Sequence, residues 1–212
     1  MNPTIPLSDN QLRFFDEMCQ RTQGLIWRDL DVLTKAIADK GGCREIYRNE
    51  GGKPVLYLKR YYIYRGPYRE AMIHQFFLGD KGPLHDHPAA SWGQILKVGY
   101  HERLCAYIGN DGRTEGEYVV DRKPGDWSYR PGSNKNHDNF KGFHKVKLRK
   151  PEDAGLVKTL FIMEKRNENS WGFRANDGQF VPFDEMNRLE NTDSMQSSPD
   201  QYEYGWFPRR IA

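Results

Sequence analysis

This chain of 212 residues has no long apolar stretch and little imbalance of charge. A membrane-spanning helix needs about 18 consecutive apolar residues, and the mean hydropathy here is -0.86. The N-terminal residues also lack the basic start and apolar core of a secretory signal. Lysine and arginine number 32 against 29 acidic residues, and the resulting net charge of +3 is too small to indicate a nucleic-acid partner. We therefore expect a cytoplasmic protein that does not bind membranes.

Cysteine is scarce, and none has the CxxC spacing of a zinc site. Cys19, Cys43 and Cys105 are widely separated and odd in number, which is more typical of a reducing compartment than of a disulfide framework. Stability must therefore come from a hydrophobic core. With 37% hydrophobic and 13% aromatic residues, a chain of this length can bury one such core. We expect a single folded domain.

The periodicity of the sequence changes from helical to strand-like near residue 50. Between Ser8 and Lys40, apolar residues recur at helical spacing, Ser8 has the character of an N-cap, and Gly41-Gly42 ends the pattern. Beyond Gly51-Gly52, short runs rich in β-branched and aromatic residues alternate with turn signals. The strands expected are 55–58, 61–64, 72–78, 92–98, 104–108, 118–120, 127–130, 143–148 and 157–163. Many short strands separated by such turns predict a sandwich or a closed barrel.

These patterns divide the chain into three parts. Residues 1–50 form an N-terminal helical extension, 51–186 a β-barrel, and 187–212 a polar, partly flexible tail. The aromatic end of that tail, Tyr202 to Ile211, is expected to dock on the domain or on a second subunit. A homodimer is one expectation, because a bare edge strand tends to pair with another.

The most informative feature is a pair of histidines, His85 and His87, in an extended segment. Side chains at i and i+2 of a strand project from the same face, so both imidazoles can point at one metal ion. A pair of ligands is not yet a site.

The residues around this pair resemble the cupin superfamily. Its first motif, G(X)5HXH(X)3-4E(X)6G, is matched by Gly79, His85, His87 and Gly99, with Trp92 in the glutamate position. Its second motif, G(X)5PXG(X)2H(X)3N, is matched by Gly125 and Pro131, with Ser133 replacing a glycine and Asn136 standing where histidine is expected.

The chain also resembles uncharacterised bacterial and phage HDHP-type cupins. The shared segments are His85 to Pro88, Gly99 to Glu102, Thr159 to Phe161, Trp171 to Phe173 and Gly178 to Pro182. The resemblance covers about Tyr57 to Glu185. It implies a mainly β, single-domain cupin fold, the double-stranded β-helix or jelly-roll barrel, and it leaves the reaction open.

Two histidines compete for the place of third ligand. In Phe143 to Leu148, His144 shares one face with Val146 and Leu148 while the two lysines share the other, so His144 points inward. His137 lies in a polar loop without apolar periodicity, although it is only one place from the motif position. The strand around His144 also resembles the third-ligand strand of the thiol dioxygenase branch of the cupins. We expect His144, with His137 as the alternative.

A triad of His85, His87 and His144 without a carboxylate suggests the metal and its chemistry. Imidazole suits Fe, Ni, Cu and Zn, whereas an added glutamate would favour harder ions such as Mn. Three neutral ligands leave positions open for an anionic or thiolate substrate and O2, as the resemblance to the thiol dioxygenases implies. Fe(II) is our first choice of cofactor, with Zn, Ni or Mn as alternatives.

Other polar residues are candidates for the same site. Arg130 could clamp a substrate carboxylate and Tyr129 could donate a proton, or both could lie at the rim. His74 alternates in phase with Met72 and Phe76, so it should face the interior. Glu102 could act as a general base, but we expect it at the surface. Trp92 stands where some thiol dioxygenases carry a crosslinked cysteine, which argues against that crosslink.

The leading hypothesis is a mononuclear non-haem Fe(II) oxygenase acting on a small polar substrate. One alternative is a non-oxidative cupin enzyme, such as a sugar-type isomerase or epimerase or a lyase, with a histidine as base. Another is a non-catalytic ligand-binding cupin. Pocket residues in a barrel come from many strands, so the tertiary structure decides which side chains face the substrate.

Overall fold

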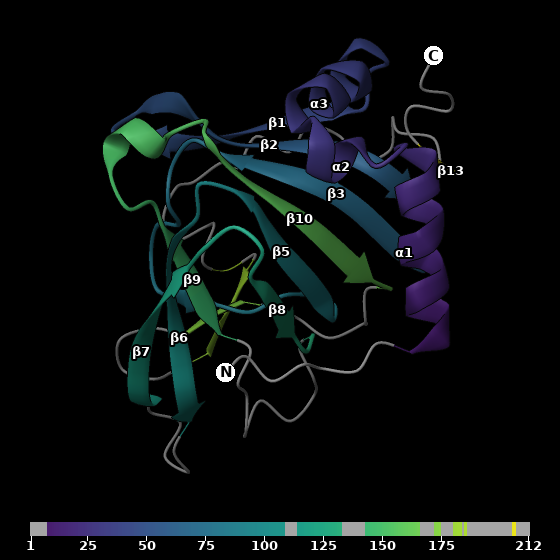
Figure 1. Cartoon of the computed structure of the whole chain (residues 1–212). Helices are drawn as coiled ribbons and strands as arrows, with labels where there is room; N and C mark the ends of the chain where they lie inside the picture. Colours follow the sequence, from purple (N-terminus) through teal and green to yellow (C-terminus); the bar gives the residue numbers. More distant parts are fainter. Residues whose placement is uncertain are drawn as a thin grey trace.

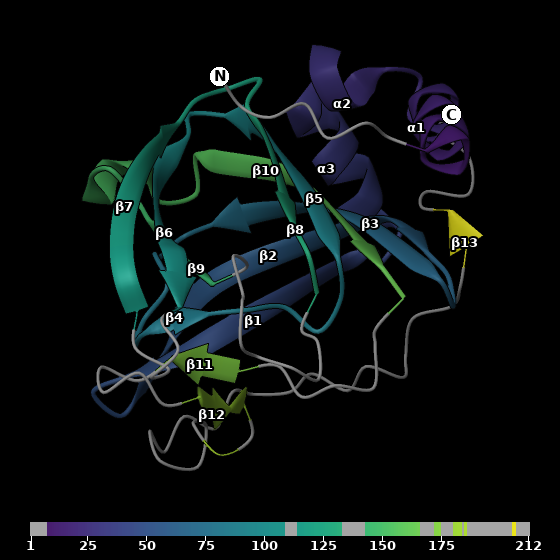
Figure 2. The same cartoon turned by 90° about the horizontal axis from the view of Figure 1, so that it is seen from below.

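The computed structural model describes residues 8–108, 114–132, 143–165, 172–174, 180–183, 185 and 205–206. Within these residues the strands form two antiparallel sheets that lie face to face (Figure 1, Figure 2). The first sheet has seven strands in the order β1 (Cys43–Glu50), β2 (Lys53–Arg65), β3 (Arg69–Phe76), β10 (Val157–Glu164), β5 (Ser91–Lys97) and β8 (Trp127–Arg130), with β13 (Gly205–Trp206) beside β2. The second has six, in the order β12 (Phe180–Pro182), β11 (Gly172–Arg174), β4 (Leu84–His85), β9 (His144–Lys147), β6 (Tyr100–Ile108) and β7 (Thr114–Arg122). The expected mainly β jelly-roll is confirmed.

The N-terminal helical stretch begins where the sequence predicts but is divided into three pieces. These are α1 (Asp9–Arg21), α2 (Leu25–Arg28) and α3 (Leu30–Asp39). Ser8 is the N-cap of α1 and forms a capping box with Gln11, since each side chain accepts a hydrogen bond from the other residue's backbone N–H. Gly24 divides the stretch because it adopts a left-handed conformation, with φ of +69°. None of the helices in the described residues is long and apolar enough to span a membrane.

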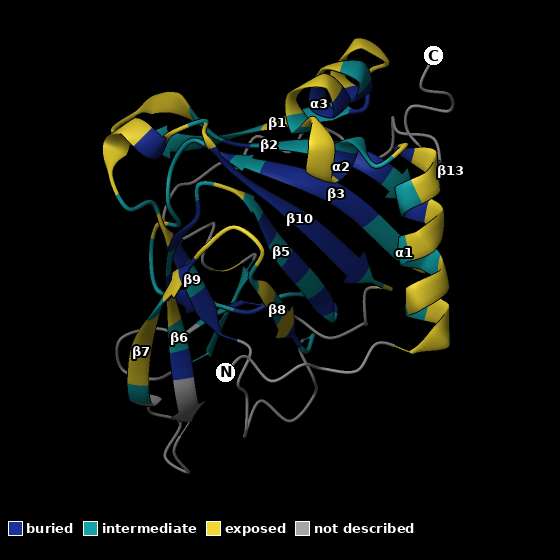
Figure 3. Cartoon of the chain, in the orientation of Figure 1, coloured by how far each residue is buried: buried dark blue, intermediate teal, exposed yellow. Residues whose placement is uncertain are grey.

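The helices cover the outer face of the seven-stranded sheet (Figure 1). One apolar cluster joins them to it, and its fully or nearly buried members are Met18, Ile26, Leu33, Ile37, Tyr61, Ile63, Ala71, Ile73, Leu160 and Ile162. Strand β10 is therefore buried on both faces, by helices outside and by the second sheet inside, and seven of its eight residues are buried (Figure 3). Burying one Leu or Ile side chain completely stabilises a fold by about 1.5–3 kcal/mol. This layer holds the sheet that forms one wall of the barrel.

The interior between the sheets is apolar at its two ends and polar in the middle. One end is filled by Leu58, Phe76, Ile95, Tyr100, Val146 and Val157. The other is filled by Tyr62, Met72, Ala89, Phe161 and Met163. Because side chains at i and i+2 share a face, the residues between the two clusters on β2, β3 and β10 also face inward. These are Arg60, His74 and Thr159, and they lie side by side in register, forming what we call the polar row.

Two strand pairings bear on the expected division of the chain. Strand pairing begins at Cys43, because β1 forms a long antiparallel hairpin with β2, so the sheet starts inside the stretch expected to be the helical extension. β13, from the aromatic segment expected to dock, pairs with β2. The rest of 187–212, the loop from Ser133 to Asn139 and Trp171 lie outside the described residues. The three cysteines, all described, are not joined by disulfides.

Candidate metal centre

Three histidines from the six-stranded sheet meet inside the barrel. β4 pairs with β9 so that His85 lies directly opposite His144, and His87 follows β4 after one residue. The candidate ligand atoms of the three side chains all lie within 4.8 Å of one another. The Nε2 atoms of His87 and His144 are 2.7 Å apart. The pair predicted from the HxH spacing and the third histidine are thus brought together by a cross-strand pairing between residues 59 positions apart in the sequence.

The inward orientation of His144 is confirmed. The side chains of His144 and Val146 are buried, and Lys147, on the opposite face of β9, is exposed, as the alternation of the sequence predicts. The alternative ligand, His137, lies outside the described residues.

Burial sets the protonation state of the histidines. Removal from solvent, reinforced by the nearby Arg130 charge, lowers the pKa of His144 from its ordinary value of 6.5 to about 4. Burial, together with the neighbouring imidazoles, also lowers the pKa of His87 well below its usual range. Both rings are therefore neutral at pH 7, which is the form that binds a metal ion.

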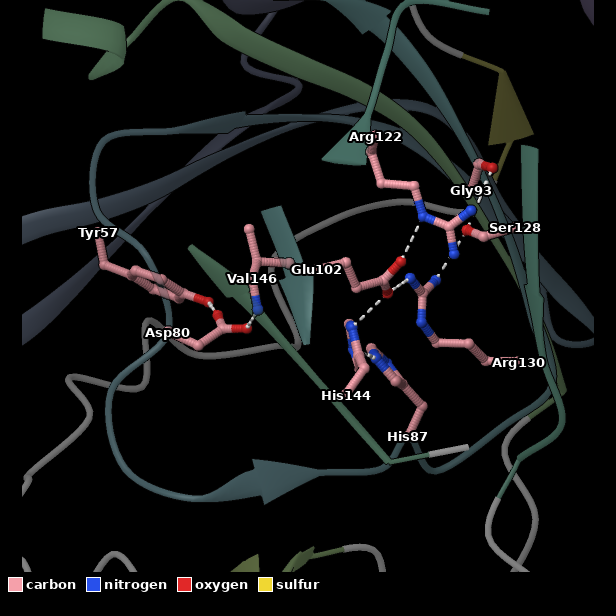
Figure 4. Close-up of polar contacts among 10 residues, drawn as sticks. All are labelled: Tyr57, Asp80, His87, Gly93, Glu102, Arg122, Ser128, Arg130, His144 and Val146. Carbon is pink, nitrogen blue, oxygen red and sulfur yellow. Dashed lines mark hydrogen bonds and ion pairs between the residues drawn. The ribbon is translucent and has the colours of Figure 1, made fainter. Parts of the chain in front are cut away.

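Glu102 is a member of the site that the sequence analysis placed wrongly. It was expected at the surface, but its side chain is completely buried and its Oε1 lies 2.9 Å from Nδ1 of His144 (Figure 4). Arg130 also donates to Oε1, and Nε of Arg122 donates to Oε2 at 2.6 Å. Burial opposes ionisation of this carboxyl, but the adjoining Arg130 charge and the bond from His144 outweigh it and hold its pKa well below the usual range. A signal existed in the sequence: Glu102 alternates in phase with Tyr100, while His101 and Arg103 occupy the other face of β6.

Arg130 and Tyr129 lie on opposite faces of β8. Arg130 is buried, and its two terminal nitrogens contact protein oxygens: one donates to Glu102 and the other to Oγ of Ser128, at 3.1 Å. These are the nitrogens that a bidentate clamp on a substrate carboxylate would use. Tyr129 is 36% exposed and packs against Trp92, with ring centroids 5.1 Å apart. The structure therefore brings Arg130 to the histidines and does not bring Tyr129.

Strand β5 carries the position at which the motif has its glutamate, and neither candidate residue there is a carboxylate. The motif allows that position to fall on residue 91 or on residue 92. Trp92 pairs in register with Tyr129 and Ser91 with the buried Arg130, so Ser91 is the residue that faces the interior. Ser91 is fully buried. The inner wall thus presents a hydroxyl at this point.

The polar row forms the wall opposite the histidines. The ring of His74 stacks on Phe161 at 4.8 Å, and Phe161 in turn lies 5.5 Å from the ring of His87. Burial, followed by the Arg60 charge, lowers the pKa of His74 well below its usual range. The expected inward orientation of His74 is confirmed. Among the described residues, Nε2 of His74 and Nε of Arg60 are buried and have no hydrogen-bond partner.

A separate cavity lies on the outer face of the seven-stranded sheet. Its volume is about 330 Å³, and Trp27, Asp31, Gln94 and Lys97 are among the residues that line it. Trp27 donates to Gln94 at 3.1 Å, and Asp31 accepts from Lys97 at 3.1 Å. The sheet separates this cavity from the histidines, so it is no part of the candidate metal centre.

Comparison with known proteins gives partial likenesses to solved structures. No protein-family model and no curated protein matches the sequence. Among solved structures, the cupin-2 domain Rru_A2000 of Rhodospirillum rubrum is 18% identical with a TM-score of 0.41, covering 72% of this chain and 84% of that one. The DMSP lyase DddQ of Ruegeria pomeroyi DSS-3 is 17% identical with a TM-score of 0.35, covering 62% of this chain and half of that one. KdgF from Halomonas sp. is 16% identical with a TM-score of 0.35, covering 52% and 81%.

The chain is built of two antiparallel sheets, and three histidines meet between them. Its group of His85, His87 and His144 could hold a metal ion, and the donor chemistry fits one. Burial keeps the rings of His87 and His144 neutral. The carboxylate of Glu102 lies behind the ring of His144, which is a common arrangement around metal-binding histidines.

Proposed function

We propose that this chain is a metal-dependent cupin enzyme, and that its activity is that of a mononuclear non-haem Fe(II) oxygenase acting on a small polar substrate. The observation that carries the proposal is a trio of imidazoles without a carboxylate among the candidate ligands. Such a shell suits Fe, Zn, Ni or Cu. Fe(II) held there would supply open coordination positions for a substrate and for O2.

The surrounding residues support a polar substrate that carries negative charge. Arg60 and Arg130 place two positive charges on the interior face of the seven-stranded sheet, while Glu102 is occupied by His144 and the arginines. The polar row faces the histidines across the barrel, and the positive charge of the partly buried Arg60 attracts an anionic group. We assign Arg60 and His74 to orienting the substrate, and Arg130 to holding Glu102. Phe161 and Met72 exclude water from the reacting atoms.

A non-oxidative reaction is the second candidate, and His74 is the observation that favours it. Its imidazole is neutral, buried and, among the described residues, unpartnered at Nε2. Such a group can accept a proton from a bound substrate. In that case the barrel would act as an isomerase, epimerase or lyase, and the metal would be optional.

The proposal is tested first by the metal content of protein purified without added metal or chelator. We expect about one iron per chain, with the metal lost in His85→Ala, His87→Ala and His144→Ala. His101→Ala is the matched control, because this side chain is 44% exposed, and it should keep the metal. Loss of metal from His137→Ala but not from His144→Ala would show that the ligand assignment is wrong.

The reaction is tested by O2 uptake with a panel of small thiols and carboxylates. Iron-dependent consumption of O2 by the wild type, abolished in His144→Ala, is the expected result. Turnover of a substrate by metal-free protein, abolished in His74→Ala, would instead establish the non-oxidative reaction. Protein that holds no metal and has no activity would favour a ligand-binding barrel.

A further inference from the structure

Glu102 is a buried carboxylate in the wall of the barrel, where a charge is costly. Its side chain is 0% exposed, and placing an ion in such surroundings costs several kcal/mol unless close partners offset it. Arg122 and Arg130 are those partners (Figure 4). A buried group of two arginines and a glutamate can be replaced by apolar residues with little loss of stability. The two ion pairs alone therefore do not explain why a carboxylate is buried at this position.

The third partner of Glu102 gives it a role at the metal centre. Its Oε1 lies 2.9 Å from Nδ1 of His144. A carboxylate can only accept a hydrogen bond, so Nδ1 of the neutral ring must carry the proton. The lone pair is then on Nε2, the atom that lies 2.7 Å from Nε2 of His87. The contact thus selects one of the two tautomers of the ring.

On its other side, the ring of His144 contacts the two other histidines. The ring centroids of His85 and His144 are 4.7 Å apart, and those of His87 and His144 are 4.9 Å apart, so the neighbours on that side are themselves candidate ligands. Glu102 acts from the far side of the ring, and its backbone pairs with Val146, two residues beyond His144 on β9. The pairing of β6 with β9 therefore holds Glu102 beside the strand that carries His144.

We infer that Glu102 is a positioning residue, which holds His144 as the Nδ1–H tautomer and directs Nε2 at the metal ion. The inference rests on the proposed function as far as the metal is concerned. The tautomer is a property of the protein alone, so the two can fail separately. An interaction of this kind with a metal-binding histidine is typically worth 10–100-fold in metal affinity.

Asp80 offers a matched control. Its carboxylate also binds β9, accepting from the Val146 N–H at 2.6 Å, and it also accepts from the hydroxyl of Tyr57 (Figure 4). The Asp80→Asn substitution therefore removes a carboxylate that supports the same strand without touching His144. A variant that affects only the stability of β9 should resemble Asp80→Asn.

The test combines ¹⁵N NMR of histidine-labelled protein with a competition titration of Zn²⁺. In metal-free wild type we expect the His144 signals, assigned by their loss in His144→Gln, to be those of the Nδ1–H tautomer. Glu102→Gln should give a mixture of tautomers and bind Zn²⁺ 10–100-fold more weakly. Asp80→Asn should keep the Nδ1–H tautomer, and its Zn²⁺ affinity should stay within about 3-fold of the wild type, well below the loss expected for Glu102→Gln. This should hold even if its unfolding temperature falls.

A second variant, Glu102→Asp, distinguishes loss of the hydrogen bond to His144 from misfolding of Glu102→Gln. Glu102→Asp keeps the negative charge for both arginines but is one methylene shorter, so it should also lose the single tautomer. An Nε2–H tautomer in the wild type, or equal Zn²⁺ affinity in the wild type and both Glu102 variants, would overturn the inference. Equal loss of affinity in Asp80→Asn would do the same. Failure of the wild type to bind Zn²⁺ or iron would count against the proposed function, while the tautomer would still decide the role of Glu102.

Discussion

Acidification should destabilise the metal-free protein through His144. The pKa of this ring falls from 6.5 to about 4 on folding, chiefly because burial removes it from water. Between these two values the unfolded chain binds a proton that the folded protein does not. Stability therefore decreases as the pH falls through 6.5. The effect is fully developed only when the pH reaches about 4.

The magnitude follows from the shift. A difference of 2.5 between 6.5 and 4 corresponds to about 3 kcal/mol, because one unit is worth about 1.4 kcal/mol. About 2 kcal/mol of this should be lost between pH 7 and pH 5. His74 and His87, whose pKa values are also lowered by burial, should steepen the dependence of the wild type. The contribution of His144 to the pH dependence of stability is therefore measured as the difference between the wild type and His144→Gln.

Urea unfolding at pH 7 and pH 5, with a chelator present, measures that difference. The wild type should lose about 2 kcal/mol more than His144→Gln over this interval. His101→Gln, at a histidine that stays in solvent, should lose as much as the wild type does. Parallel curves for the wild type and His144→Gln would refute the reasoning, because the ring would then titrate alike in the folded and unfolded chains.

Three further predictions concern the scaffold. Gly99→Ala should lower stability by at least about 1–3 kcal/mol, since φ is +103° and the new Cβ would lie 2.2 Å from the carbonyl oxygen of Arg122; an unchanged melting temperature would contradict this. Leu160→Ala should cost about 2–5 kcal/mol in urea unfolding, because this fully buried side chain joins the helices to the sheet, and a loss under about 1 kcal/mol would mean that the site collapses around the cavity. Ser8→Ala should cost about 0.5–2 kcal/mol and speed amide exchange in α1, whereas faster exchange spread over the sheets would argue against a local cap.

Much of the fold was predictable because it rests on local patterns. Alternation over two residues located most of the long strands, and it also gave the inward orientation of His74 and His144. The short strands β11 and β12 were missed, since three residues carry no periodicity, whereas β4 was expected as the extended segment around His85. β1 was missed as well, because its mostly half-buried side chains give no clean alternation.

The site was predictable only in part, for a related reason. Two candidate ligands at i and i+2 can be recognised in any extended segment. Glu102 instead looked like a surface residue, because its partners Arg122, Arg130 and His144 are 20, 28 and 42 positions away in the sequence. Charge is normally exposed, and only the presence of opposite charges from two other strands, those of Arg122 and Arg130, makes its burial tolerable.

The sequence by itself determined the mainly β architecture, the His85 and His87 pair and the face on which His144 lies, because each depends on patterns within single segments. The tertiary structure alone decided that His85 stands opposite His144, that Tyr129 faces away from them and that Glu102 lies behind the third ring. These depend on the register between strands, which is set by the burial of both sheet faces together and cannot be read from any one segment.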